Sequence, residues 1–390
     1  QTDHPEWADR FQSINWGVYS GGPPSGFDQS SNHDRDLDGH GSHCAGIAVG
    51  KTFGWAKGAR VLHQKISGLE GTGDSGTGIS PSVAFDVIKA WHNAKTINPN
   101  TGYKRPTVIN MSWGYLATYT NASIDEINYR GTSYTGTDID SSTERENNYG
   151  LIYNIYDITT YATNVRIVSV DTDIEELLEA GVHICCAAGN RSHKIDESGG
   201  DDYDNYFSEG VDTPQYYHRG SSPYGDAGQD GTGQRAIIVG NMDSNSASST
   251  NDQKANSSEC GPGVDIYAPG TNIMSATSDT NKFTDSTYYA NSNYRQCNIS
   301  GTSMASPNVA GVLACMLEIY PEWTPAYAKQ WLKDNAGSRI LNTGTSNDWT
   351  NDRSLKGGDA KVLHMSLSNS KPVSISGFSK LSFNIKIKQK

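Results

Sequence analysis

Short apolar runs alternate along the chain with longer stretches whose apolar residues have helical spacing. The runs predict strands at residues 59–67, 107–111, 165–170, 182–190, 236–241 and 264–268. The longer stretches predict helices at residues 80–94, 173–180, 309–320 and 326–335, with another after His40. This alternation indicates an α/β layer fold with a largely parallel sheet. In such folds functional groups gather beyond the carboxyl ends of strands, so the site is expected after Ser67, Met111 and Ala188.

Two long polar stretches interrupt this pattern, at about residues 115–164 and 191–234. They are rich in Tyr, Asn, Asp, Ser and Gly and show little periodicity, so we interpret them as surface insertions at the functional rim of the sheet. After residue 365 lysines appear without acidic residues, and residues 381–387 alternate like a half-exposed strand. We therefore expect one domain over residues 1–365 and a tail over 366–390 that adds an edge strand; a docking tail for a partner is the alternative.

The bulk composition excludes two classes of partner. The net charge is −12 and no basic stripe is present, which argues against a nucleic-acid surface. No apolar run approaches the length needed to cross a membrane, so no membrane partner is expected. The location stays open, with the extracellular space or a larger assembly favoured over a membrane.

The six cysteines do not decide the redox compartment. Four of them lie in apolar runs and are expected to pack as small buried hydrophobes, namely Cys44, Cys185, Cys186 and Cys315. Cys260 and Cys297 flank one predicted region and could pair, but six cysteines in 390 residues make no disulfide framework.

Two residues stand in surroundings that suit chemistry. Ser303 lies in a run of small residues, and the helix predicted to begin just past it would point its N-terminal amides at the hydroxyl, where negative charge could develop. His40 has glycine on both sides and could transfer protons near neutral pH. The alternatives are a tight turn that leads into a buried helix and a structural, hydrogen-bonded histidine.

Five motifs in order along residues 4 to about 335 resemble the subtilisin-like serine protease family, peptidase family S8. They are Gly-His-Gly-Ser-His-Cys-Ala-Gly at 39–46, Asn-Met-Ser-Trp-Gly at 110–114, Ala-Ala-Gly-Asn at 187–190, Ala-Pro-Gly at 268–270 and Gly-Thr-Ser-Met-Ala-Ser-Pro at 301–307. The resemblance implies a three-layer α/β fold, with a mostly parallel central sheet flanked by helices.

The resemblance also implies a serine endopeptidase that acts on peptides or proteins and requires no cofactor or catalytic metal. Ser303 would attack the peptide carbonyl, His40 would take and return the proton, and Asn190 with the Ser303 N–H would form the oxyanion hole. Backbone around the site would bind the substrate as an added strand, from Ser112, Trp113, Gly114, Gly76, Thr77, Gly78, Ala188 and Gly189.

The sequence departs from the family at the third member of the triad. The family places an aspartate in an Asp-x-Gly turn after the first core strand, a few residues before a His-Pro pair that corresponds here to His4-Pro5. Both the aspartate and the first strand are therefore expected upstream of Gln1. Asp3 is the nearest carboxylate but lacks the following glycine, and Asp34, Asp36 and Asp38 are interpreted as a solvated acidic turn or a cation site.

Three explanations stay open for this departure. The sequence begins after a missing segment, a separate upstream chain supplies the strand and the aspartate, or the domain is a catalytically silent structural or binding module of a larger assembly.

The only metal ion that the resemblance suggests is a structural calcium ion. Residues 49–56 pass compactly through the region where many family members wrap a calcium ion, so that site is expected to be absent. The acidic loop at residues 196–204 has enough carboxylates for a hard cation, although a solvated surface loop is the simpler interpretation.

Overall fold

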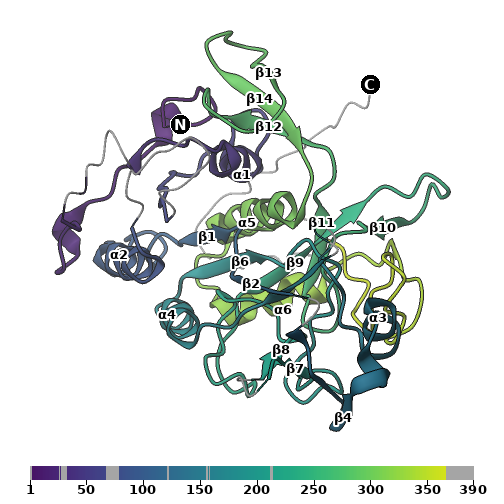
Figure 1. The fold of residues 1–390 in the computed structure, drawn as a ribbon. Coiled ribbons are helices and arrows are strands. Elements are labelled where there is room, and N and C mark those ends of the chain that lie inside the picture. Colours follow the sequence, from purple (N-terminus) through teal and green to yellow (C-terminus); the bar gives the residue numbers. More distant parts are fainter. Residues whose placement is uncertain are drawn as a thin grey trace.

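The fold is built on a six-stranded sheet in the computed structural model, which describes residues 2–25, 27, 33–66, 79–120, 123–154, 157, 159–210 and 214–365. Along the sheet the strands are β1 (Val108–Met111), β6 (His183–Ala187), β9 (Ile237–Asp243), β10 (Asp252–Lys254) and β15 (Ile340–Leu341), with β11 (Ile266–Pro269) paired to β9 (Figure 1). The pairs β1–β6, β6–β9 and β9–β11 are parallel, so the expected mostly parallel sheet is confirmed.

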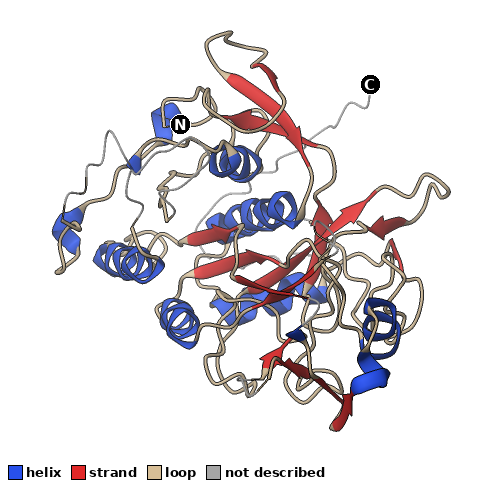
Figure 2. Ribbon diagram, viewed as in Figure 1, coloured by secondary structure: helices blue, strands red, loops and turns tan. Residues whose placement is uncertain are grey.

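Helices cover both faces of this sheet, which gives three layers (Figure 2). One face packs against α2 (Pro81–Ala94) and α4 (Val168–Glu179), and the other against α5 (Thr302–Ile319) and α6 (Pro325–Asp334). Successive strand residues point to opposite faces. Thus Cys186 lies in the cluster with Leu177 of α4, while Cys185 lies in the cluster with Leu313 of α5.

A smaller antiparallel sheet and one more helix sit beyond α5. The sheet has the order β12 (Ile273–Thr277), β14 (Arg295–Ile299) and β13 (Asp285–Thr287). Helix α1 (His40–Val49) lies between this sheet and α5, where Cys44 and Ile47 pack with Met304. Two short 3-10 helices precede it, η1 (Ala8–Arg10) and η2 (Trp16–Val18).

The two polar stretches fold together. The first holds β2 (Leu116–Thr120), β3 (Glu126–Tyr129), β4 (Thr132–Thr135), η5 (Gly136–Ile139), α3 (Ser142–Tyr149) and β5 (Thr160–Asn164), and the second holds β7 (Tyr206–Ser208) and β8 (Gln215–Tyr216). Strand β3 pairs with β7 in a sheet of order β4-β3-β7-β8, and Ile127 and Phe207 are fully buried in a shared apolar cluster. The two polar stretches therefore contain strands and a helix, although their weak periodicity predicted no regular elements.

Most of the predicted elements are present, but two predicted strands are wrong. Residues 165–170 leave β5 and enter α4, because Val170, Ile174 and Leu177 bury a face with helical spacing rather than an alternating one. In the predicted strand at 59–67, residues 61–66 make no ladder and only one isolated bridge, between Val61 and Phe11. Ser67 itself and the tail at 366–390 lie outside the described residues.

All six cysteines are free. Cys260 and Cys297 do not form a disulfide. The backbone of Cys260 forms an isolated β-bridge with Lys194, whereas Cys297 lies in strand β14. Among the residues that the structure describes, no helix is both long enough and apolar enough to cross a membrane.

Candidate active site

Four element ends converge at one edge of the central sheet. Strand β1 ends at Met111 and leads to Ser112, β6 ends at Ala187 and leads to Asn190, and α1 and α5 begin at His40 and Thr302. Helix α5 thus begins one residue before Ser303, and not just past it as expected. The edge is the predicted one, because the carboxyl ends of parallel strands lie together.

Ser303 is held at this edge by contacts from two neighbouring elements. Its Oγ donates a hydrogen bond to the carbonyl oxygen of Ser112 at 3.3 Å. The carbonyl oxygen of Ser303 accepts hydrogen bonds from the Ser112 hydroxyl at 2.9 Å and from the Cys44 thiol at 3.3 Å. The serine is therefore fixed against both β1 and α1.

The side-chain amide of Asn190 has a fixed orientation. Its Oδ1 accepts hydrogen bonds from the backbone N–H of Thr302 at 2.9 Å and from the Thr302 hydroxyl at 3.0 Å, and that hydroxyl also accepts from the Gly189 N–H at 3.1 Å. Because the amide oxygen already accepts two hydrogen bonds, the NH₂ group of Asn190 is the part of the side chain that can donate a hydrogen bond. The Ser303 N–H belongs to the first turn of α5, where backbone N–H groups have no partner within the helix. Two donors of this kind suit an oxygen that gains negative charge.

The close approach of Asn190 to the start of α5 depends on a glycine. Gly301 has a φ of 151°, and a Cβ at this position would lie 3.3 Å from Asn190 Oδ1. Any larger residue would crowd the amide, which explains the glycine in the motif at 301–307.

His40 is the first residue of α1 and lies on the side of the helix that faces α5. Cys44, one turn later on the same face, touches the Ser303 carbonyl. Burial lowers the pKa of His40, while the charge of Asp38 acts in the opposite direction. In the part of the chain that the structure describes, no hydrogen bond joins the His40 ring to Ser303 Oγ or to a carboxylate.

The acidic turn before His40 is partnered rather than solvated, which corrects that interpretation. Asp36 accepts backbone hydrogen bonds from Asp38, Gly39 and Ser42 at 3.2, 2.8 and 2.7 Å and so caps the N-terminus of α1. Asp38 forms an ion pair with Lys282, and Asp34 lies 3.4 Å from His63 Nε2. Asp36 therefore holds the start of α1, while Asp38 and Asp34 have basic partners outside the helix.

The predicted substrate-binding backbone borders the same edge. The Trp113 ring stacks on Phe85, with 6.4 Å between ring centroids. A Cβ on Gly114 would lie 2.7 Å from Ser221 Oγ. The Ala188 carbonyl accepts a hydrogen bond from the Tyr224 hydroxyl at 2.6 Å. The other predicted residues of this group, Gly76, Thr77 and Gly78, lie outside the described residues.

Directly behind Gly189 lies a buried carboxyl group that the sequence interpretation missed. Gly189 has a φ of 121°, and a Cβ there would lie 2.3 Å from Glu259 Oε1. Glu259 is fully buried, Asn164 donates to its Oε2 at 2.8 Å, and its Oε1 has no partner. Burial raises the pKa of Glu259 to about 8. No local pattern marks this residue, because it stands in a polar stretch without periodicity.

Two carboxylates of the acidic loop at residues 196–204, Asp196 and Asp202, are engaged by basic side chains. Lys194 contacts Asp196 at 3.1 Å and Asp202 at 2.6 Å, and Arg130 contacts Asp202 at 2.7 Å. Asp196 and Asp202 are buried, whereas Glu197, Asp201 and Asp204 are exposed, so the loop is solvated only in part. Within the described residues, no group of three or more histidine, cysteine, aspartate and glutamate side chains is placed to hold a metal ion.

Curated relatives of this chain are subtilisin-like serine proteases. It is 29% identical over 305 residues to the subtilisin-like serine protease pepC of Aspergillus niger, covering 77% of this chain and 38% of the relative. It is 26% identical over 286 residues to the subtilisin-like protease 3 of Saccharomyces cerevisiae, covering 73% of this chain and 39% of the relative. The chain therefore spans about two fifths of the length of these relatives.

A solved structure and a family model complete the comparison. The structure, described as a cold adapted subtilisin-like serine proteinase, has 21% sequence identity and a TM-score of 0.48, with 93% of this chain and 84% of that chain covered. The model of the subtilase family, Peptidase S8, matches residues 2–365. This match covers nearly the whole chain and includes every element that forms the site, and the chain therefore belongs to the subtilase family of serine peptidases.

Proposed function

We propose that the protein is a serine endopeptidase whose nucleophile is Ser303. The observation that carries the proposal is that the oriented amide of Asn190 is held by Thr302, the residue directly before Ser303. Asn190, held by Thr302, stands beside the first turn of α5, where the Ser303 N–H is available. This arrangement of donors is suited to the tetrahedral oxyanion of acyl transfer.

The reaction proceeds in two stages without a cofactor. Ser303 Oγ attacks the substrate carbonyl as His40 takes its proton, and His40 returns that proton to the leaving amine. Water then hydrolyses the acyl-enzyme by the same route. The lowered pKa of His40 keeps its ring neutral at neutral pH, which is the form that accepts a proton.

The orienting aspartate of the triad is proposed to come from polypeptide upstream of Gln1, either in the same chain or in a separate one. In support, the carboxylates near His40 are already engaged: Asp36 caps α1 and Asp38 pairs with Lys282. Loss of this aspartate in subtilisin lowers kcat about 3 × 10⁴-fold. Residues 1–390 without it would therefore be nearly inert.

A catalytically silent binding or structural module is the second candidate. Two observations favour it. Ser303 Oγ donates to the Ser112 carbonyl rather than to His40, and among the described residues no carboxylate is hydrogen-bonded to the His40 ring.

A fluorophosphonate probe separates the two candidates. The chain should be tested with its upstream polypeptide restored, beside a Ser303→Ala variant and a control, Ser286→Ala, which changes an exposed serine in β13. Labelling of the restored chain and of the control, but not of Ser303→Ala, supports the peptidase. Absence of labelling in the restored chain would leave the silent module as the function.

A further inference from the structure

The carboxyl group of Glu259 lies directly behind the turn that carries Asn190. A Cβ built on Gly189, the residue before Asn190, would lie 2.3 Å from Oε1, 2.4 Å from Cδ and 2.7 Å from Oε2 of Glu259. The whole carboxyl group therefore faces the Gly189 backbone. Because Glu259 is fully buried, this group supports the edge of the site from behind and does not reach solvent.

Both polar groups of the Gly189 backbone are hydrogen-bonded. The N–H donates to the Thr302 hydroxyl at 3.1 Å, and the carbonyl oxygen accepts from the Glu259 N–H at 3.0 Å. That carbonyl belongs to the peptide unit that joins Gly189 to Asn190. A displacement of Glu259 is therefore passed to Asn190 through a single peptide unit.

The loop that carries Glu259 is held on two sides. On one side it runs along the segment after β6, where the Ser192 N–H donates to the Ser257 carbonyl at 2.9 Å. On the other side Lys254 is fully buried, and its ammonium group donates hydrogen bonds at 3.0, 3.2 and 2.7 Å to carbonyl oxygens within residues 255–258. These contacts fix the place of the Glu259 carboxyl group.

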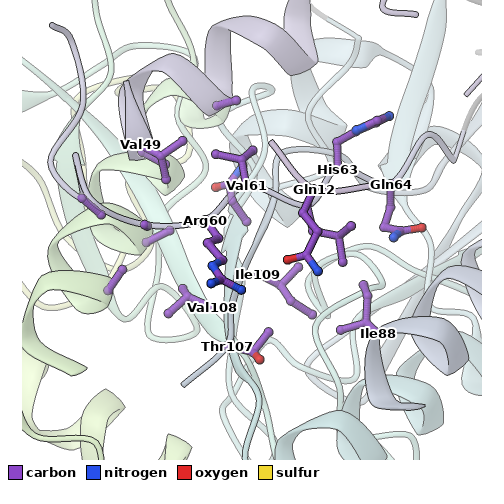
Figure 3. Close-up of a pocket in the computed structure, with 18 of the residues that line it drawn as sticks. Gln12, Val49, Arg60, Val61, His63, Gln64, Ile88, Thr107, Val108 and Ile109 are labelled. Carbon is purple, nitrogen blue, oxygen red and sulfur yellow. The ribbon is translucent and has the colours of Figure 1, made fainter. Parts of the chain in front are cut away.

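One oxygen of this carboxyl group has no hydrogen-bond partner among the described residues. Asn164, at the end of β5, donates to Oε2 at 2.8 Å, whereas Oε1 is buried and unpaired. Other unpaired polar atoms, those of Gln12, His63 and Gln64, line a large cavity beside β1 (Figure 3). Glu259 does not line that cavity, so an occupant of the cavity would not supply a partner for its Oε1.

The titratable side chains that face Glu259 come from several elements: Arg191 after β6, Tyr224 between β8 and β9, Lys254 at the end of β10 and Lys356 after β15. Burial raises the pKa of Glu259 to about 8, although the three basic groups and the hydrogen bond from Asn164 act in the opposite direction. The carboxyl group is therefore neutral at neutral pH. An ionised carboxylate with an unpaired oxygen is costly in a buried place.

We infer that Glu259 is a positioning residue of the proposed oxyanion hole: its side chain backs Gly189 and holds the peptide unit from which Asn190 presents its amide. The inference rests on the proposed function, in which this amide stabilises the oxyanion. Glu259 acts through Gly189 and not on the substrate. When Glu259 ionises, the carboxylate must move toward water or a basic side chain, and the Gly189 turn moves with it. Turnover should therefore require the protonated form.

The first measurement follows the Asn190 amide by NMR and needs no turnover. The chain of residues 1–390 is labelled with isotopic asparagine, and the Asn190 NH₂ signal is identified by its absence in Asn190→Ala. The signal should shift with a midpoint near pH 8 in the parent chain and stay constant in Glu259→Gln, which keeps the shape of the side chain but does not ionise. Asp173→Asn is the matched control, because burial also raises the pKa of Asp173 in α4 and one of its oxygens is likewise unpaired. It should behave like the parent.

The second measurement is the pH dependence of kcat in the protein with its upstream polypeptide restored. In the parent and in Asp173→Asn, kcat should fall about tenfold between its plateau and about pH 9, with little change in KM. In Glu259→Gln, kcat should stay within about twofold over this range. A role of Glu259 in stability alone would change unfolding but not this profile.

Three results would overturn the inference. The first is an Asn190 signal that does not change with pH in the parent chain. The second is a shift that persists in Glu259→Gln, which would belong to Lys254, whose pKa burial lowers to about 8. The third is an alkaline loss of kcat that is the same in Glu259→Gln as in the parent. A signal that titrates through Glu259, in a protein without turnover after restoration, leaves the link between Glu259 and Asn190 standing and counts against the peptidase.

Discussion

At the scale of single residues, Thr302 orients the side-chain amide of Asn190. Thr302 holds the amide oxygen with two donors, and the NH₂ group of Asn190 is thereby oriented before any substrate arrives. A donor that is already oriented needs no reorganisation when negative charge develops. The contribution of Asn190 is therefore expected in the transition state rather than in substrate binding.

The first prediction concerns this amide. In the protein with its upstream polypeptide restored, Asn190→Ala should lower kcat about 10²–10³-fold, the typical loss for one oxyanion-hole donor, with little change in KM. Thr302→Val, which removes the hydroxyl but keeps the backbone N–H, should give a smaller loss. Steady-state kinetics on a peptide substrate measure both, with Asn335→Ala, at the residue that follows α6, as a control away from the site. A normal kcat in Asn190→Ala would show that the oxyanion hole lies elsewhere.

The second prediction concerns pH and Glu259. The pKa of Glu259 rises from 4.5 to about 8 on folding because the side chain is buried. Between these two values the unfolded chain loses a proton that the folded chain keeps, so stability should fall as pH rises from about 4.5 to about 8. The loss is on the order of 4 kcal/mol.

Urea unfolding at pH 5 and pH 8 measures this effect. Glu259→Gln mimics the protonated group, so it should lose less stability over this range than the parent chain. Glu318→Gln changes an exposed glutamate in α5 and should behave like the parent. Equal pH dependence in all three proteins would mean that Glu259 is not the group that titrates.

At the scale of elements, the distance between α1 and α5 sets the relation of His40 to Ser303. The two helices come close at Gly311, where an added Cβ would lie 2.7 Å from the Ala48 carbonyl oxygen and 2.9 Å from Trp55 Cβ. A backbone atom cannot move aside alone, so the helix that carries it must shift.

The third prediction follows from this contact. Gly311→Ala should push α1 away from α5, lower stability by about 1–3 kcal/mol and slow fluorophosphonate labelling of Ser303 in the restored protein. Gly58→Ala is the matched control, because a Cβ there meets nothing within 4 Å. Thermal unfolding and the labelling rate are the measurements. If Gly311→Ala is destabilised but is labelled at the normal rate, the packing of α1 on α5 does not control the alignment of His40 with Ser303.

At the scale of the whole molecule, the two polar insertions form one layer across a long sequence separation. Strand β3 pairs with β7, and Phe207 packs with Ile127 and Tyr119 at the junction. Each insertion thus covers apolar surface of the other, and neither is expected to keep its order alone.

The fourth prediction tests this mutual support. Phe207→Ala should destabilise the layer by about 3–5 kcal/mol, because a fully buried aromatic ring is lost. Hydrogen exchange should then rise in residues 123–135 as well as in residues 206–216, while β6 keeps its protection. Tyr289→Ala, at an exposed ring in the loop after β13, serves as the control. Faster exchange confined to 206–216 would show that the insertions are independent.

The fold and the site were predictable from sequence to different degrees. Ser303, His40 and Asn190 stand in motifs of contiguous residues, and helices such as α2 have clear apolar spacing. Pairing of β3 with β7 joins segments some 80 residues apart, and no local pattern encodes it. The β-branched run at 165–170 fits a strand and a helix equally well, and burial alone decides between them. Glu259 gains its position and raised pKa only from tertiary packing.

The thiol of Cys44 can report on the separation of α1 from α5 in solution. It donates to the Ser303 carbonyl between α1 and α5, and burial raises its pKa to about 12. Alkylation requires an exposed thiolate, so iodoacetamide should modify Cys44 only during moments when the two helices separate. Cys185 and Cys186 lie within the central sheet and should react only when the whole molecule unfolds. Mass spectrometry can measure the alkylation rate of each cysteine in the native chain. The rate at Cys44 would report local opening, and the rates at Cys185 and Cys186 would report global unfolding.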